Sequence, residues 1–388
     1  LCDRRQRQMC IRDSYYATRS YFASSDYMGL ASGLTIAGIG NEKIQWERTR
    51  RINIGVDANL LNNRLGVRFN YFRSATDHLL MWQEMSYLSG LDKTWGNGGK
   101  LENRGFDVEA TGVVWASPSW QWQVGASVGH YKNKVTALPD GQRYMDTEIL
   151  GATVRTEIGR PANLFYGYKA QGVFSTSAEA QAAGLYIHDD NGVDRTAFEA
   201  GDMHFADLDG DHFITEADRM VIGDPNPDIY GNIFTSVQYR RLRLDVRFNY
   251  SLGNDIYNYT RQQLESGSRF MNQTTALARR WQMEGQQTDI PRLSFQDPMG
   301  NSRFSDRWIE DGSYLRLKTV TLSYDLPVSS TFLQGLQFWV QANNVVTLTR
   351  YLGSDPEGTA LSAVLGQGID AGSLPQSRNF MVGIKINL

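Results

Sequence analysis

The sequence has 388 residues and a net charge of −3, with charges of both signs spread along its length. It has no concentrated basic field, so we do not expect it to bind nucleic acid through counterion release. No apolar run reaches the roughly 18 residues of a membrane-spanning helix, which leaves a β-barrel open because barrel strands hide only alternate side chains in lipid. Gly is abundant at 37 and Pro scarce at 10, a mixture that favours strands joined by tight turns.

The first 14 residues differ from the rest of the chain. Both cysteines, Cys2 and Cys10, lie here, and the segment has neither an apolar period nor a signal-peptide core. We expect residues 1–14 to be a non-native or disordered leader and residues 15–388 to form one partial outer-membrane barrel domain. The alternative for the leader is a native disulfide or metal pair, although no His lies nearby to complete a metal spacing.

Strict alternation of apolar and polar residues begins at residues 51–60. Its apolar face consists of Ile52, Ile54, Val56, Ala58 and Leu60. Ten residues match the length of a tilted membrane-spanning strand, and Asn62-Asn63 then supplies a tight turn into a mirrored strand at 65–71. The same pattern recurs at 106–114, 120–128, 242–250, 336–342 and 380–388. Alternation at this length predicts membrane strands.

The second face of these strands is strongly polar. Around Leu244 it consists of Arg241, Arg243, Asp245, Arg247 and Asn249. Such a face is too charged for a protein core and suits a water-filled lumen. Aromatic residues also gather near strand ends, as interfacial girdles require: Trp46, Tyr71, Phe72, Trp120, Trp122, Phe248, Tyr250 and Phe380. The sequence therefore predicts an all-β, antiparallel transmembrane barrel.

The connections fall into two sizes. Short turns are expected near 61–63, 117–119 and 240, and long polar excursions near 74–100, 253–312 and 351–377. Outer-membrane barrels show this asymmetry, with short periplasmic turns and long outer loops. The stretch 132–228 contains one weak strand, at 165–174, although two strands there would be needed to restore the parity of the strand count. Segments 178–183 and 275–283 have helix-like composition.

The sharpest local motif is residues 207–218, inside an expected long loop region at 175–228. Its spacing fits a twelve-residue calcium loop whose ligands are Asp207, Asp209, Asp211, Phe213 (through its carbonyl), Thr215 and Asp218. Two departures are His212, where calcium loops place Gly, and Asp218, where they place Glu. The alternative is a solvated acidic loop that turns without an ion. No helix pair flanks the motif, so a bound calcium ion is expected to brace a surface loop.

We find no pattern that indicates catalysis. The five His are dispersed, and no nucleophile elbow, HExxH or phosphate-loop spacing is present. A His beside an acid in a loop, such as Asp77-His78, is far more often solvated than catalytic. The sequence does not predict an enzyme.

Many ordered motifs resemble the SusC/RagA-type TonB-linked outer-membrane transporters, from about residue 44 to the end. They lie at 101–109, 157–161, 165–168, 207–211, 218–227, 253–258, 288–293, 311–318 and 343–351. The resemblance implies the C-terminal part of a barrel of about 22 strands, plugged by an N-terminal domain. It also implies import of a glycan or peptide across the bacterial outer membrane, with TonB and a SusD-like lipoprotein as partners and lipid around the barrel.

Only about ten to twelve alternating segments are present, roughly half of what such a barrel needs. We therefore expect this chain alone neither to insert nor to transport. Two alternatives to active transport remain. One is a structural or adhesive barrel, which an upstream plug domain and a neighbouring SusD-like gene would reject. The other is a secreted carbohydrate-binding β-sandwich, which would be soluble without detergent.

Overall fold

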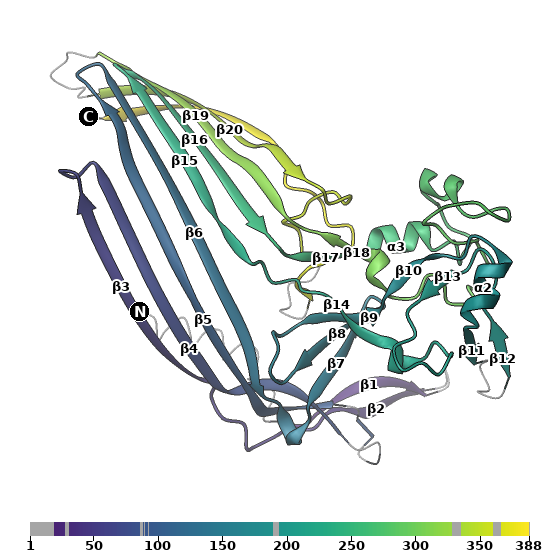
Figure 1. Ribbon diagram of the computed structural model, residues 1–388. Helices are drawn as coiled ribbons and strands as arrows, with labels where there is room; N and C mark the ends of the chain where they lie inside the picture. The colour runs from purple at the N-terminus through teal and green to yellow at the C-terminus, as the bar shows by residue number, and fades with distance from the viewer. Residues whose placement is uncertain are drawn as a thin grey trace.

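The structure is a computed structural model that describes residues 19–27, 31–85, 88, 90–91, 93–188, 194–327, 335–359 and 366–387. The leader predicted at 1–14 and the terminal Leu388 lie outside these residues. Strands dominate, and they separate into one long wall and a set of small sheets in the loops at one end of it (Figure 1). Among the described residues, no helix is long and apolar enough to cross a bilayer.

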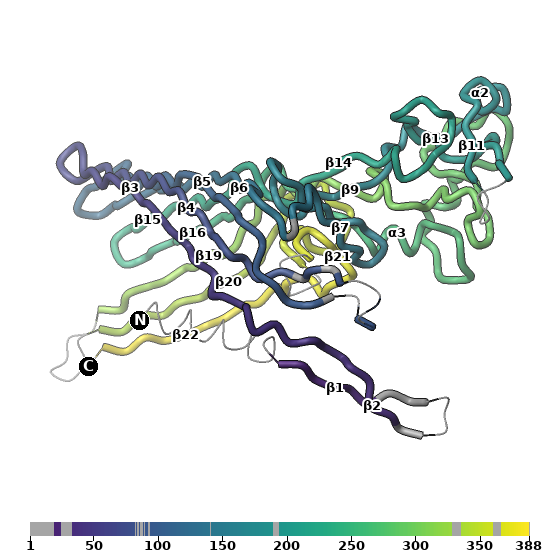
Figure 2. The backbone as a smooth tube through the Cα atoms, turned by 90° about the horizontal axis from the view of Figure 1, so that it is seen from below, coloured from purple at the N-terminus to yellow at the C-terminus, as the bar shows by residue number. Residues whose placement is uncertain are grey.

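The wall is a sheet of nine antiparallel strands in the order β22-β20-β19-β16-β15-β6-β5-β4-β3. Its strands are β3 (Arg48–Leu60), β4 (Leu65–Glu84), β5 (Lys93–Ala116), β6 (Trp120–Ala137), β15 (Ile229–Tyr239), β16 (Leu242–Leu252), β19 (Tyr314–Leu326), β20 (Gly335–Thr349) and β22 (Asn379–Asn387). Seen from below, the wall curves but does not close, and β3 and β22 form its two edges (Figure 2). The predicted antiparallel barrel architecture is confirmed as an open wall.

Tight turns join neighbouring strands at the end of the wall away from the loops. Between β3 and β4 the residues Leu61, Asn62 and Asn63 have φ of 54°, 54° and 64°. Asn tolerates this left-handed region, which is why Asn-Asn suits the turn. Arg240, with φ 53°, makes the equally short link between β15 and β16. The predicted turns at 61–63, 117–119 and 240 are confirmed.

Two expectations about the wall were wrong. The stretch 74–100 is mostly strand, because β4 runs to Glu84 and β5 begins at Lys93. These extensions lack alternation, since Leu79, Leu80 and Met81 follow one another directly in β4, and register shifts follow Thr76 and Leu79. The weak strand at 165–174 lies in the loops as β9 (Leu164–Tyr168) and β10 (Ala170–Val173), and the single strand that joins β6 to β16 in the wall is β15, which follows the stretch 132–228.

The loops carry four small sheets, and a separate hairpin lies near the N-terminal end of the described chain. The sheets are β7 (Tyr144–Ile149), β8 (Ala152–Glu157), β9 and β14 (Arg219–Gly223); β10 with β13 (Met203–Phe205); β11 (Tyr186–His188) with β12 (Arg195–Ala197); and β17 (Asp255–Asn258), β18 (Ile309–Asp311) and β21 (Ile369–Asp370). The hairpin pairs β1 (Tyr21–Tyr27) with β2 (Ala31–Gly38). The loop sheets lie side by side at one end of the wall (Figure 1).

The helices are short and lie in the loops. They are α2 (Ser177–Ala183), α3 (Tyr259–Glu265) and the 3₁₀ turns η2 (Pro139–Gly141), η3 (Glu216–Asp218), η4 (Thr275–Arg279) and η5 (Asp306–Trp308). The helix predicted at 178–183 is confirmed as α2, which Thr176 and Glu179 begin with a reciprocal capping box. The segment at 275–283 forms only the 3₁₀ turn η4.

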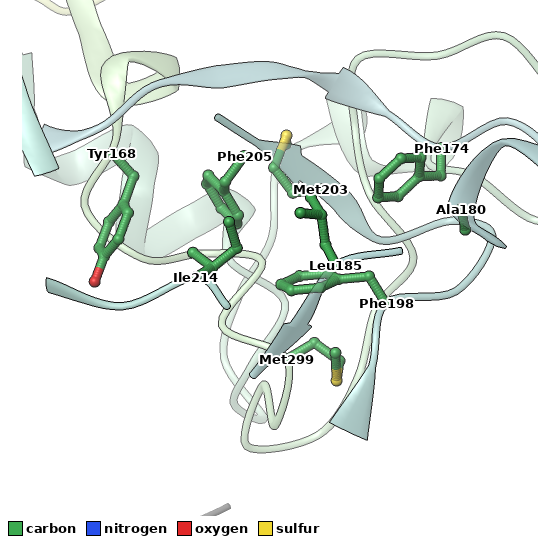
Figure 3. Close-up of a cluster of buried hydrophobic side chains, with 9 residues drawn as sticks. All are labelled: Tyr168, Phe174, Ala180, Leu185, Phe198, Met203, Phe205, Ile214 and Met299. Atoms are coloured by element: carbon green, nitrogen blue, oxygen red, sulfur yellow. The ribbon is translucent and has the colours of Figure 1, made fainter. Parts of the chain in front are cut away.

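The loops have hydrophobic cores of their own. One cluster consists of Tyr168, Phe174, Ala180, Leu185, Phe198, Met203, Phe205, Ile214 and Met299, whose side chains gather between the small sheets (Figure 3). A second consists of Ala152, Val154, Phe165, Tyr257, Trp308 and Ile369. Residues distant in sequence share each cluster, so the long connections form a folded body, which we call the outer loop body.

Candidate binding site in the barrel wall and outer loop body

Strand pairing gives the wall one apolar and one polar face. A row across four strands consists of Val56, Phe69, Val108 and Val128, and the next row consists of Asp57, Arg68, Glu109 and Ser127. Neighbouring residues of a strand point to opposite sides, so these rows lie on opposite faces. The apolar face is uncovered, with Ile54 61% and Val382 78% exposed. Nothing in the described chain shields it from solvent, as expected for a lipid-facing surface.

Aromatic side chains border the apolar face where the tight turns lie. One row there consists of Trp120, Tyr239, Leu242, Tyr324 and Phe338. The rings of Trp120 and Tyr239 are 4.5 Å apart, and both side chains are at least 40% exposed. Aromatic rings prefer the depth of lipid headgroups. This row therefore marks one edge of the membrane band.

The polar face holds a hollow of about 490 Å³ between β4 and β19. Its lining includes Asn70, Asp107, Ser127, Asn232, Asn249 and Tyr314. The amide of Asn232 donates to the Ser127 hydroxyl at 2.7 Å. Gly129 leaves room for the Tyr230 ring, since a Cβ there would lie 2.7 Å from it. Carboxamides, hydroxyls and aromatic rings together offer hydrogen bonds and stacking surfaces to a polar ligand.

On the polar side of the wall, charged side chains of neighbouring strands lie opposite one another. Arg68 donates to Asp57 and to Glu109, each at 3.0 Å. All three side chains are well exposed, so each ion pair contributes less than about 1 kcal/mol to stability. Their main effect is to hold the charged groups in place on the polar face. A smaller hollow of about 280 Å³ is lined by Arg243, Asp245 and Arg247. These residues lie on the polar face, as predicted.

A buried ion network fixes the loop after β20 to the polar face. Arg316 is 2% exposed and donates to Asp355, to Glu357 at 2.6 Å and to the Thr347 hydroxyl at 3.0 Å. Burial alone raises the pKa of the Asp355 carboxyl, but the hydrogen bonds from Arg316 and nearby backbone N–H groups outweigh it and lower that pKa. Sequence reasoning missed this network, although Arg316 lies within the family-like motif at 311–318.

A second polar cluster joins three loops of the outer loop body. The Tyr351 hydroxyl donates to Asp370 at 2.6 Å, and burial, reinforced by this carboxylate, raises the pKa of Tyr351. Glu310 accepts from Asn258 at 3.2 Å and from Arg261 at 2.7 Å. The backbone N–H of Leu352 also donates to Glu310 at 2.8 Å, so these contacts connect the segments after β16, before β19 and after β20. The outer loop body is therefore cross-linked above neighbouring strands of the wall.

The acidic motif brings its first three carboxylates together. The nearest oxygens of Asp207, Asp209 and Asp211 lie within 4.8 Å of one another. Asp207 accepts backbone hydrogen bonds from Gly210 at 2.8 Å and His212 at 2.9 Å. His212 has φ 67°, so it adopts the left-handed conformation that Gly usually provides at this position. The loop is curled in the manner its spacing predicts.

The last three predicted ligands have other contacts. Asp218 is fully buried and accepts backbone hydrogen bonds from Leu208 at 2.7 Å and Thr215 at 2.8 Å, which closes the base of the loop. The Thr215 side chain caps η3. Phe213 forms an isolated bridge with Tyr186, so the loop is attached to β11. Asp218 does not belong to the group of three carboxylates.

The clustered carboxylates and their backbone partners shift the pKa values of Asp209 and Asp207 in opposite directions. The backbone N–H of Asp211 lowers the pKa of the Asp209 carboxyl, but burial and the neighbouring carboxylates of Asp211, Asp218 and Asp207 outweigh it and raise that pKa. Burial raises the pKa of Asp207, but the backbone N–H groups of Gly210 and His212 outweigh it and lower that pKa. A divalent cation among the three carboxylates would relieve the repulsion.

An apolar outer face, a polar inner face, an aromatic border and long loops at one end define the class as an outer-membrane β-barrel wall. Residues 12–153 match the protein family described as TonB dependent receptor-like, beta-barrel. The predicted resemblance to the SusC/RagA-type TonB-dependent receptors is confirmed.

The similar proteins are much longer than this chain. TonB-dependent receptor P3 of Formosa agariphila is 30% identical over 368 residues, covering 92% of this chain and 35% of the relative. TonB-dependent receptor SusC of Bacteroides thetaiotaomicron is 24% identical, with 98% and 36% covered. The RagAB peptide transporter structure gives a TM-score of 0.74 at 25% identity, with 96% and 39% covered. The chain thus spans little more than a third of the length of the proteins it matches.

Proposed function

We propose that this chain is the C-terminal barrel part of a TonB-dependent importer of a glycan or peptide. The observation that carries the proposal is the polar hollow on the inner face, where Asn70, Asn232 and Asn249 converge beneath a folded outer loop body. Its groups hydrogen bond and stack, and no catalytic step is assigned to them. The likeness to SusC and to a peptide transporter supports the two substrate classes.

We assign two partners to the complete protein. TonB supplies the energy for import, and a SusD-like lipoprotein covers the outer loop body. The likeness to SusC and RagA supports both assignments. The cross-linked loops joined through Tyr351, Asp370 and Glu310 give such a lid a preformed surface.

The transport proposal is tested by two substitutions on adjacent residues of β6 in the full-length protein. Ser127→Trp projects into the hollow, whereas its matched control Ala126→Trp lies outside the lining and projects toward lipid from the apolar face. If the tryptophan costs the bound ligand about 1.4 kcal/mol, uptake at limiting substrate falls about tenfold for Ser127→Trp. Uptake of labelled oligosaccharides and peptides is measured at equal surface levels of each variant. Equal uptake by the two variants, or no uptake of either ligand by the native protein, would reject the proposal.

We also propose that the loop at 207–218 binds a calcium ion through Asp207, Asp209 and Asp211, with the Phe213 carbonyl and Thr215 completing the set and Asp218 bracing the base. The clustered carboxylates and the left-handed His212 support this assignment. The alternative is the same loop held by its own hydrogen bonds.

Calorimetric titration of the full-length protein with calcium decides between them. We expect binding that Asp209→Asn weakens at least about tenfold, and that declines in acid as the carboxylates protonate. Asp194→Asn, in the same loop region but outside the motif, is the control. Absence of calcium-dependent heat in the native protein at millimolar calcium would establish the ion-free loop.

A further inference from the structure

The outer face of β3 to β6 carries a second aromatic border, at the end of the apolar band nearer the loops. The row consists of Ile54, Tyr71, Phe106 and His130. The rings of Phe106 and His130 are 5.5 Å apart, and Tyr71 is 39% exposed. Together with the row at the tight turns, it bounds the apolar band on both sides. The barrel's long loops face outward from the cell, so this border lies in the outer leaflet.

Cationic side chains follow directly beyond this border. The next two rows on the same face consist of Ile52, Arg73, Arg104 and Lys132, and then Arg50, Ala75, Glu102 and Lys134. We call Arg50, Arg73, Arg104, Lys132 and Lys134 the outer basic patch. Two residues along a strand advance roughly 7 Å. The patch therefore begins about one headgroup's depth beyond the aromatic rings.

The patch has more cations than acids to pair with them. Arg73 pairs with Glu102 at 2.8 Å, and Arg50 reaches Asp77 at 3.6 Å. Arg104, Lys132 and Lys134 are exposed, and the described part of the chain offers none of these three an ion pair. Glu102 also attracts Arg104 and Lys134 from a greater distance, but one carboxylate among Arg73, Arg104, Lys132 and Lys134 leaves this surface with an excess of positive charge.

Contacts on the opposite face of β6 confirm that these cations point outward. The Tyr131 hydroxyl and the Asn133 amide both donate to Asn226, at 3.3 and 3.1 Å. The outer loop body therefore covers the inner side of β6 at this height, and the alternate residues Lys132 and Lys134 are left on the outer side.

We propose that the outer basic patch binds the phosphate groups of an outer-leaflet lipid, which makes it a docking surface for a phosphorylated glycolipid headgroup. The order of residues along this face carries the proposal: an apolar band, an aromatic row, and then cations in excess of their acids, where anionic headgroups lie. Basic clusters at a membrane boundary recognise anionic lipid in this way. The proposal goes beyond transport, because it depends only on the placement of the wall in the membrane.

The test compares the full-length protein in detergent with a variant carrying Arg104→Gln, Lys132→Gln and Lys134→Gln. The probes are phosphorylated lipid A and the same lipid after dephosphorylation. We expect the native protein to prefer the phosphorylated form, and the variant to bind it on the order of a hundredfold more weakly. The matched control, Arg64→Gln, Arg240→Gln and Arg241→Gln, removes equal charge from exposed positions at the tight turns and should leave binding unchanged.

A variant that should bind the lipid more tightly shows whether weaker binding in the patch variant could be due to misfolding. Glu102→Gln removes the acid paired with Arg73 and should strengthen binding of phosphorylated lipid A by up to about fivefold. Equal affinity for the two lipid forms, or equal loss in the patch variant and its control, would overturn the proposal. So would binding of an acidic polysaccharide in place of phosphorylated lipid, since that result would assign the patch to another partner.

Discussion

The 388-residue chain alone is expected to fail to insert into bilayers and to conduct no ions or solutes. Its wall has two edges within the described residues, β3 of 13 residues and β22 of 9 residues. A strand edge presents unpaired backbone N–H and C=O groups, and each such group costs several kcal/mol when it lies in hydrocarbon. The total penalty exceeds the stability of an ordinary domain, so the effect should be all or none.

The measurement is refolding of the chain into lipid vesicles, followed by solute-release and conductance recordings. The chain should remain accessible to added protease and aggregate through its edges, and vesicles should stay sealed. The full-length protein is the positive control, because additional strands can pair with β3 and β22. A stable, protease-resistant pore formed by the chain would contradict the prediction and would imply closure by several copies.

Alternation predicted the parts of the strands that lie within the membrane band. There the outer faces of β3, β4 and β22 are apolar because they contact lipid, and the sequence carries that constraint residue by residue. The same constraint explains the aromatic borders: Trp120 and Trp122 were predicted at a strand end and lie near the tight turns.

Where the wall departs from alternation, sequence reasoning missed strands. In β15, Tyr230 and Phe234 point to the polar face, where Gly129 and Gly125 on β6 make room for their rings. In β19 the register shifts after Leu317, which moves the apolar positions from odd to even residues. The compensating glycines and the bulge are properties of strand pairs, so one strand read alone does not reveal them.

The candidate site also has a part that the sequence predicts and a part that it does not. The predicted ligands of the acidic loop lie within twelve residues, and their spacing was enough to predict that the carboxylates of Asp207, Asp209 and Asp211 come together. Arg316 and its partners Asp355 and Glu357 are separated by 39 and 41 residues, with a whole hairpin between them. Only strand register and loop path bring them into contact, and the sequence specifies neither locally.

Replacing Arg316 of β19 with Met is expected to destabilise strongly the attachment of the loop after β20 to the wall. It leaves the buried Asp355 carboxylate and the half-buried Glu357 carboxylate without their cation, and breaking a buried pair from one side typically costs about 3–5 kcal/mol. The loss should be local, because β19 and β20 keep their backbone pairing and only the loop depends on Arg316. Lys318 still contacts Glu357 and Gln376, so we expect residues 351–359 and 366–377 to open more often while the strands stay paired.

Hydrogen exchange and limited proteolysis of the full-length protein measure this effect. Residues 351–359 and 366–377 should lose protection in Arg316→Met and recover part of it in Arg316→Lys, which keeps the charge but loses the planar guanidinium. Arg68→Met is the matched control, since its partners Asp57 and Glu109 are exposed and its pairs contribute less than about 1 kcal/mol each. Equal loss of protection in Arg68→Met would refute the argument.

The pH dependence of this loss distinguishes a broken ion pair from a packing defect. Because Arg316 helps to hold the pKa of Asp355 below its ordinary value, the pair's contribution is fully present above that ordinary value, about 4, and declines as pH falls through the lowered one. In Arg316→Met the same carboxylate is released from its burial penalty once it is protonated. The difference in loop protection between native protein and variant should therefore narrow in acid, whereas a packing defect would leave it constant.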